Sequence, residues 1–109
     1  MRRWTLRPRE DCYAWKFSAN HPPTLRRTWH ALKEVMAPGV LEPLVKELLY
    51  VAFSVTNNWE YCLASHTAAA RRTGMTDEML GELLAIVGMA NETNRLAVGY
   101  RIAVDPAFR

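Results

Sequence analysis

The apolar positions from residue 21 onward recur every three or four residues, which is the spacing of one face of an α-helix. Thr24, just after a pair of prolines, is the expected N-cap of a first amphipathic helix. The apolar stripe of this helix consists of Leu25, Trp29, Leu32 and Met36. Pro38-Gly39 then ends it, because neither residue favours continuation of a helix.

A second helix is predicted to begin near Glu42-Pro43, since proline is well tolerated in a first turn, and to continue to Val55. After Glu47 the segment is apolar on nearly every side, so it is expected to be the central, buried helix. The β-branched Val51 and Val55 would also suit a strand, but the length of the segment and its proline start favour a helix.

Two further helices are predicted beyond a break at Asn57-Asn58. The first runs to about Thr73 and stops at Gly74, and the second opens with Thr76-Asp77-Glu78, which has the acidic first turn of a helix. The residues of this last helix that are expected to face the core are Leu80, Leu83, Leu84 and Val87.

Residues 91–99 either extend that helix or form a separate one, and Asp105-Pro106 terminates the fold. The pattern as a whole contains no internal repeat and no convincing strand. It predicts an all-α domain of about five to six helices at residues 21–109, preceded by an N-terminal arm at residues 1–20.

Composition narrows the class of protein. The 109 residues suffice for one domain, and no apolar run approaches the roughly 18 residues of a membrane span. The N-terminus lacks the apolar core and cleavage site of a signal peptide, so a soluble, cytoplasmic protein is expected. Two cysteines, Cys12 and Cys62, are too few for a disulfide framework or a structural zinc site, and neither metal nor cofactor is predicted.

The positive charge is concentrated near the N-terminus. Residues 1–33 hold eight Lys or Arg against two acids, whereas residues 34–109 hold six against nine. A basic arm can touch nucleic acid, but this one lacks a nucleic-acid-binding module. Its Trp4, Trp15 and Phe17 favour packing against the body or a neighbouring subunit, so no nucleic-acid partner is predicted.

The candidate chemistry lies in the third predicted helix. Cys62 and His66 are four residues apart and therefore share one helix face, and Glu47 precedes them by one helix. Thiol, base and acid are the parts of an activated cysteine. Because Cys62 is near a helix N-terminus, a lowered pKa and a higher reactivity than that of Cys12 are expected.

Each of these residues also has a purely structural interpretation. Cys62 can be a small buried hydrophobe, and His66 can be a histidine that is hydrogen-bonded within a helix interface. A buried Glu47 needs a partner, which is either His66 across the hairpin or Lys46 and solvent at the surface.

The stretch at residues 47–70 resembles the core of the alkylhydroperoxidase D and carboxymuconolactone decarboxylase superfamily, and the resemblance extends over roughly residues 21–108. Two further segments are similar to this superfamily: Arg72-Thr73-Gly74-Met75-Thr76, where glycine ends a helix, and Asn94-Arg95-Leu96-Ala97. In the peroxidase branch a glutamate precedes a Cys-x-x-Cys-x-x-x-His motif at a fixed interval. Glu47, Cys62 and His66 match the glutamate, the second cysteine and the histidine, and Trp59 stands in place of the first cysteine.

The resemblance implies an all-helical domain that assembles as a homo-oligomer, either a trimer or a hexamer. In that branch two cysteines cycle between dithiol and disulfide while glutamate and histidine relay protons. With Trp59 this chain cannot form that disulfide, so an oxidised Cys62 would need another thiol, and Cys12 is a candidate resolver. Trp59 and Tyr61 are expected to form walls of the pocket.

Three functions follow. In the first, the protein is an antioxidant peroxidase that reduces a hydroperoxide, with Cys62 as nucleophile, His66 as base, Glu47 as the distal relay group and a thiol reductant as partner. In the second, it is a decarboxylase or isomerase of a small carboxylated lactone, in which His66 is the base and Cys62 a bystander. In the third, it is a non-catalytic binding or scaffold protein in which Trp59 fills the space of the absent thiol.

Overall fold

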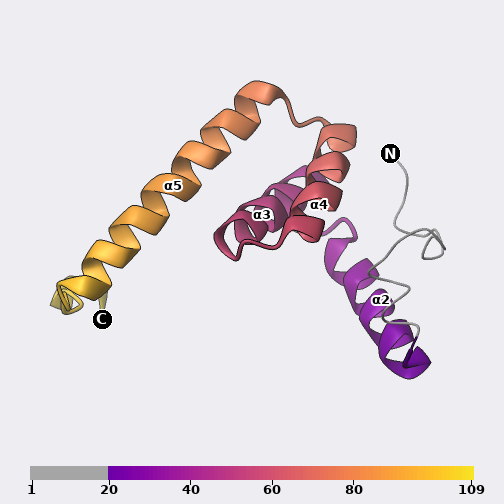
Figure 1. The fold of residues 1–109 in the computed structure, drawn as a ribbon, viewed down its shortest axis with the longest axis horizontal. Coiled ribbons are helices and arrows are strands. Elements are labelled where there is room, and N and C mark those ends of the chain that lie inside the picture. Colours follow the sequence, from indigo (N-terminus) through magenta and orange to yellow (C-terminus); the bar gives the residue numbers. More distant parts are fainter. Residues whose placement is uncertain (1–19) are drawn as a thin grey trace.

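Residues 20–109 are described in the computed structural model, and their regular structure is entirely helical (Figure 1). The elements are α2 (Pro22–Met36), α3 (Pro43–Thr56), α4 (Glu60–Thr73), α5 (Asp77–Gly99) and a 3₁₀ helix, η1 (Pro106–Phe108). The expected all-α class is confirmed. Cys12 and the aromatic residues of the arm lie outside the described residues.

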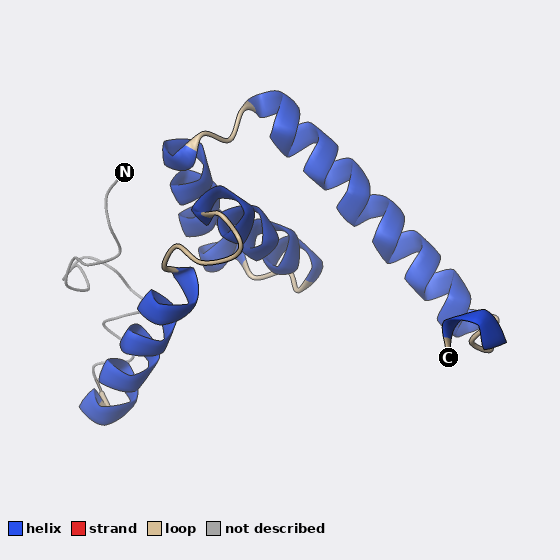
Figure 2. Cartoon of the chain, turned by 180° about the vertical axis from the view of Figure 1, so that it is seen from behind, coloured by secondary structure: helices blue, strands red, loops and turns tan. Residues whose placement is uncertain are grey.

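The antiparallel pair α3 and α4 forms the centre of the fold, and α2 and α5 leave it on opposite sides (Figures 1 and 2). Among the described helices, α3 packs most extensively against α4 and also contacts α5 and α2. Val51, Ala70 and Met75 are the buried centre of the core. The partly buried side chains packed around them come from three helices and are Leu44, Leu48, Val55, Leu63, Met79, Leu80 and Leu83.

The ends of the helices follow the local signals in the sequence. Gly74 ends α4 with a φ of 122°, a conformation that glycine adopts without strain. Thr76 caps α5, because its hydroxyl oxygen accepts a hydrogen bond from the Met79 N–H at 3.1 Å. The predicted cap at Thr24 is wrong: the N-cap of α2 is His21, three residues earlier, and Pro22 occupies the first position of the helix.

The sequence overestimates the number of helices. The described residues form four α-helices and one 3₁₀ helix, because residues 91–99 continue α5. Asn91 does not cap a new helix there: its side-chain amide donates to the Val87 carbonyl at 2.8 Å, within α5, and to the Thr56 hydroxyl at 3.3 Å. The second contact fixes the middle of α5 to the end of α3.

Helix α3 is central, as expected, but only one of its faces is buried. Glu47, Val51 and Ser54 are buried, whereas Leu49 and Phe53 are 56% and 70% exposed. In α5, Leu84 was expected in the core and is 42% exposed. The single chain therefore has too few neighbouring helices to cover the apolar surfaces that its sequence provides.

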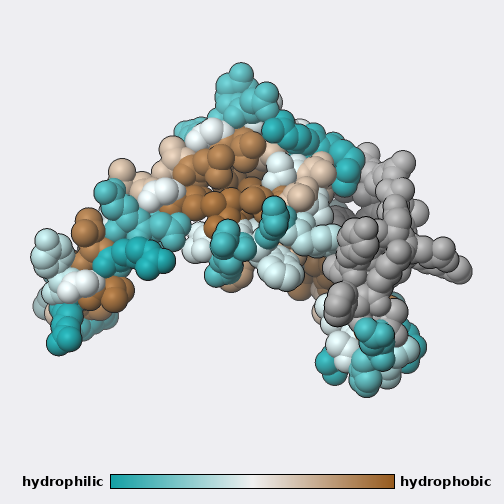
Figure 3. Space-filling model, viewed as in Figure 1, coloured by the Kyte–Doolittle hydropathy of each residue, from teal (hydrophilic) through white to brown (hydrophobic). Residues whose placement is uncertain are grey.

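The open arrangement of the helices explains this exposure. The Cα radius of gyration is 17.0 Å, compared with about 13 Å for a compact domain of this length. Figure 3 shows apolar side chains gathered on the surface where α5 adjoins the central helices and again near the end of α5. None of the described helices is both long and apolar enough to cross a membrane.

Candidate active site

The centre of the site is a buried hydrogen bond between α3 and α4. His66 Nδ1 lies 2.7 Å from Glu47 Oε2, and the two residues are only 4% and 3% exposed. Of the two partners considered for Glu47, the structure supplies His66. Lys46 instead donates to the backbone carbonyls of Val35 and Ala37 at the end of α2.

This hydrogen bond determines the role of each imidazole nitrogen. A carboxylate can only accept, so the proton between the two groups is on His66 Nδ1 when Glu47 is ionised. The lone pair of the neutral ring is then at Nε2, which becomes the basic atom. A carboxylate that holds Nδ1–H also stabilises the imidazolium that forms when Nε2 takes up a proton.

Tyr50 covers one face of the imidazole. The rings of Tyr50 and His66 are stacked, with centroids 3.8 Å apart and planes 21° from parallel. Burial raises the pKa of Tyr50, and the negative charges of Cys62 and Glu47 raise it further, so Tyr50 remains a neutral phenol. Tyr50 was not predicted as a site residue, although Glu47, Tyr50 and Ser54 share one face of α3.

Cys62 is the third residue of α4 and is partly buried. Burial raises the pKa of its thiol, and a hydrogen bond with the Trp59 side chain opposes that shift. The direction is opposite to the one expected from a helix N-terminus. Removal of the thiolate from water therefore outweighs the hydrogen bond from Trp59 in setting the pKa of Cys62.

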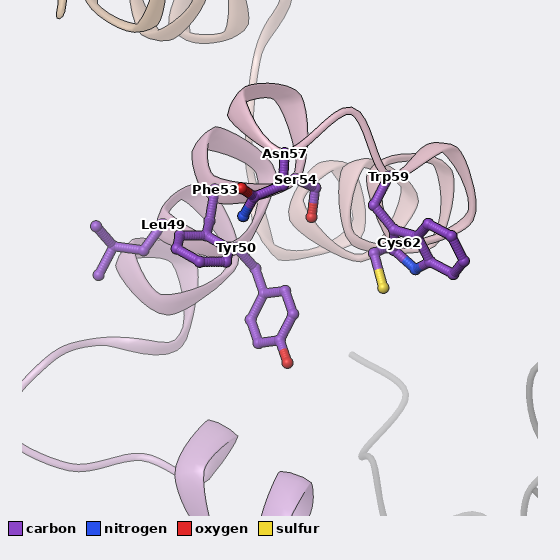
Figure 4. Close-up of a pocket in the computed structure, with 7 residues that line it drawn as sticks. All are labelled: Leu49, Tyr50, Phe53, Ser54, Asn57, Trp59 and Cys62. Atoms are coloured by element: carbon purple, nitrogen blue, oxygen red, sulfur yellow. The ribbon is translucent and has the colours of Figure 1, made fainter. Parts of the chain in front are cut away.

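The thiol opens into a pocket of about 650 Å³ (Figure 4). Its lining is mostly apolar and consists of Leu49, Tyr50, Phe53, Ser54, Asn57, Trp59 and Cys62. Trp59 was expected to be a pocket wall and is one. Tyr61 was expected in the same role but is not among the lining residues, because neighbouring positions on a helix point about 100° apart.

Metal binding has no support in residues 20–109, where no group of three His, Cys, Asp or Glu side chains is suitably placed. The described site therefore consists of a thiol, an imidazole and a carboxylate around an apolar pocket. The proposed resolver Cys12 lies outside the described residues, so its distance from Cys62 is not defined.

The chain is therefore a small all-helical protein with a buried His–Glu pair beside a thiol. The model of the carboxymuconolactone decarboxylase family matches residues 22–105, and the chain belongs to this family. No curated protein matches the chain significantly.

Among solved structures, the chain is similar to the alkylhydroperoxidase AhpD core from Rhodospirillum rubrum ATCC 11170. The two are 48% identical with a TM-score of 0.84, over 87% of this chain and 71% of that one. The AhpD-like fold that the sequence predicts is therefore confirmed.

Proposed function

We propose that this protein reduces organic hydroperoxides at Cys62 and that an external thiol then restores the cysteine. The observation that carries the proposal is the buried 2.7 Å hydrogen bond between Glu47 and His66, one helical turn from Cys62. The similarity to an alkylhydroperoxidase core supports the same reaction class.

In the proposed reaction, the basic Nε2 of His66 accepts the thiol proton of Cys62, directly or through water. Glu47 acts as the distal relay group, because its carboxylate holds the Nδ1–H and stabilises the protonated ring. This assistance is needed at neutral pH, since burial raises the pKa of the Cys62 thiol.

The thiolate attacks the terminal oxygen of the hydroperoxide, the O–O bond breaks, and the departing alkoxide takes a proton to become an alcohol. Sulfur loses two electrons and becomes a sulfenic acid. An external thiol forms a mixed disulfide with release of water, and a second thiol releases Cys62 as a thiol. The apolar lining of the pocket favours a hydroperoxide with an organic substituent.

Acid/base chemistry of the decarboxylase type is the second candidate, with a small carboxylated lactone as substrate. The Glu47–His66 pair does not depend on sulfur, and a raised pKa keeps Cys62 protonated at neutral pH. In this reaction His66 is the base and Cys62 only lines the pocket.

Two substitutions separate these functions. Cumene hydroperoxide consumption in the presence of dithiothreitol is expected from the wild type and is expected to be lost in Cys62→Ser and to fall strongly in His66→Ala. Lactone turnover that survives Cys62→Ser but not His66→Ala would support the second candidate. A wild type without either activity would support the non-catalytic interpretation.

A further inference from the structure

Trp59 lies one turn before Cys62, and both its backbone N–H and its backbone carbonyl are hydrogen-bonded. Its N–H donates to the Ser54 carbonyl at 3.0 Å, and its own carbonyl accepts from the Leu63 N–H at 3.0 Å. Asn58, just before it, has a left-handed φ of 55°, which turns the chain from α3 into α4. The indole therefore projects from a defined point at the start of α4.

The indole presents its polar edge to the reactive sulfur. Figure 4 shows the ring nitrogen turned toward the sulfur of Cys62, and a hydrogen bond from the Trp59 side chain lowers the pKa of the thiol. An indole N–H can only donate, so the sulfur is the acceptor. The ring itself lines the pocket and is 60% exposed, so a change at this position has few buried contacts to disturb.

Among the described residues that line the pocket, none carries a positive charge that could stabilise a negative sulfur. The pocket lining contains neither lysine nor arginine. The titratable groups near Cys62 are Tyr50 and Glu47 on α3 and His66 on α4, and an ionised Glu47 repels a thiolate. A donor aimed at the sulfur offsets part of this cost.

We propose that Trp59 is a catalytic residue at the reactive sulfur: its indole N–H stabilises the Cys62 thiolate and then holds the sulfenic acid until an external thiol reduces it. The second role rests on the function proposed above. Trp59 thus replaces the absent first cysteine as the group that contacts Cys62, without being able to form a disulfide. Because no disulfide forms within the site, the oxidised sulfur of Cys62 is bonded to the protein only through its own Cβ until the external thiol attacks it.

The test is the rate of iodoacetamide alkylation of Cys62 against pH, in a Cys12→Ser background so that one described thiol is followed. Trp59→Phe keeps an aromatic ring without the N–H, and Trp59→Gln keeps an N–H donor without the ring. Trp29→Phe, on α2 and outside the pocket lining, is the matched control. Thermal melting confirms that each variant is folded.

Trp59→Phe is expected to alkylate about threefold more slowly at pH 7, because loss of a charge-assisted hydrogen bond lowers the thiolate population. The midpoint of its pH profile should rise while the plateau at high pH does not fall. Trp59→Gln should lose less than Trp59→Phe, and Trp29→Phe should match the wild type.

A wild-type rate and midpoint in Trp59→Phe would overturn the proposal, as would an equal loss in Trp59→Gln. A lower plateau with an unchanged midpoint would also overturn it, since that result reports access to the sulfur and no stabilised charge. Alkylation needs no hydroperoxide, so these results are independent of whether the wild type proves to be a peroxidase.

Discussion

The imidazole of His66 is hydrogen-bonded to a partner that is nineteen residues away in sequence. Glu47 and His66 are buried, and a hydrogen bond of this kind contributes more in an apolar interior than at the surface. The sequence could indicate the pair, because a buried carboxylate in an apolar helix needs a partner. It could not indicate the stacked Tyr50, which depends on how the two helices face each other.

Replacing Glu47 by leucine keeps similar volume but removes the acceptor for His66 Nδ1. We expect Glu47→Leu to lower the free energy of unfolding by about 3 kcal/mol, because breaking a buried polar pair leaves its other member poorly compensated. Asp77→Ala breaks the exposed Arg71–Asp77 pair, whose oxygen and nitrogen are 2.6 Å apart, and should cost about 1 kcal/mol or less.

Urea unfolding at one fixed protein concentration measures both changes. Equal losses for Glu47→Leu and Asp77→Ala would show that the buried hydrogen bond contributes no more than a surface ion pair.

Cys62 provides a prediction about pH. Burial raises the pKa of the Cys62 thiol. The pH at which Cys62 is alkylated at half its maximum rate should therefore be higher than the corresponding pH for a thiol in an unstructured peptide. The folded chain also binds this proton more tightly than the unfolded chain. The resulting stabilisation is complete below the unfolded pKa and is lost as the pH rises through the folded pKa.

Cys62→Ser should therefore show less alkaline loss of stability than the wild type, measured by urea unfolding over a series of pH values. A midpoint of alkylation below that of the peptide thiol would contradict this account of Cys62.

At the scale of the elements, most boundaries were predictable because they depend on local signals. Pro43 begins α3, Gly74 ends α4 and Thr76 caps α5, as the sequence indicates. The sequence left open whether residues 91–99 extend α5, and in the structure they do, with the Asn91 amide donating to the Val87 carbonyl within the helix. Whether an asparagine caps a helix or lies inside one is decided by its neighbours in space.

The start of α4 offers a direct test of the element that carries the site. Trp59→Cys would place two thiols three residues apart, at a spacing that is compatible with a disulfide at a helix start. We expect the new thiol to bridge to Cys62 under mild oxidation. In the presence of dithiothreitol the variant should consume hydroperoxide faster than the wild type, because the second thiol removes the sulfenic acid without waiting for an external thiol. Because Trp59 is 60% exposed, the loss of its ring should cost less than the loss of a buried tryptophan.

Thermal melting, a thiol count and peroxide consumption together check this prediction. A folded variant that forms the disulfide but shows no hydroperoxide turnover at all would mean that Glu47 and His66 do not act as a relay.

At the scale of the whole molecule, the single chain exposes more apolar surface than its sequence pattern leads one to expect. A groove of about 320 Å³ runs between α3 and α5 and is lined mainly by apolar side chains, with Val45, Leu49 and Ile86 among the exposed ones. The sequence pattern placed Leu49 in a buried helix but could not say which chain buries it. Apolar residues at helical spacing are found on surfaces that a second copy of the chain covers as well as in the core of a single chain.

We therefore expect a homo-oligomer, a trimer or a hexamer, by light scattering. Ile86→Glu, which places a charge in the groove, should shift the assembly toward the monomer, because an unpaired charge is costly in an apolar contact. Thr93→Glu adds the same charge at an exposed position of α5 outside the groove and should leave the mass unchanged. A stable monomer at micromolar concentration would oppose this expectation.

The most direct test of the central claim is the mass of Cys62 after one equivalent of cumene hydroperoxide, without thiol and with a cyclic 1,3-dione that traps sulfenic acid. The account predicts rapid formation of the trapped adduct on Cys62 in the wild type and at least about a tenfold slower reaction in His66→Ala, since general base catalysis contributes factors of this size or larger. An unmodified Cys62, or equal rates in the wild type and His66→Ala, would contradict it.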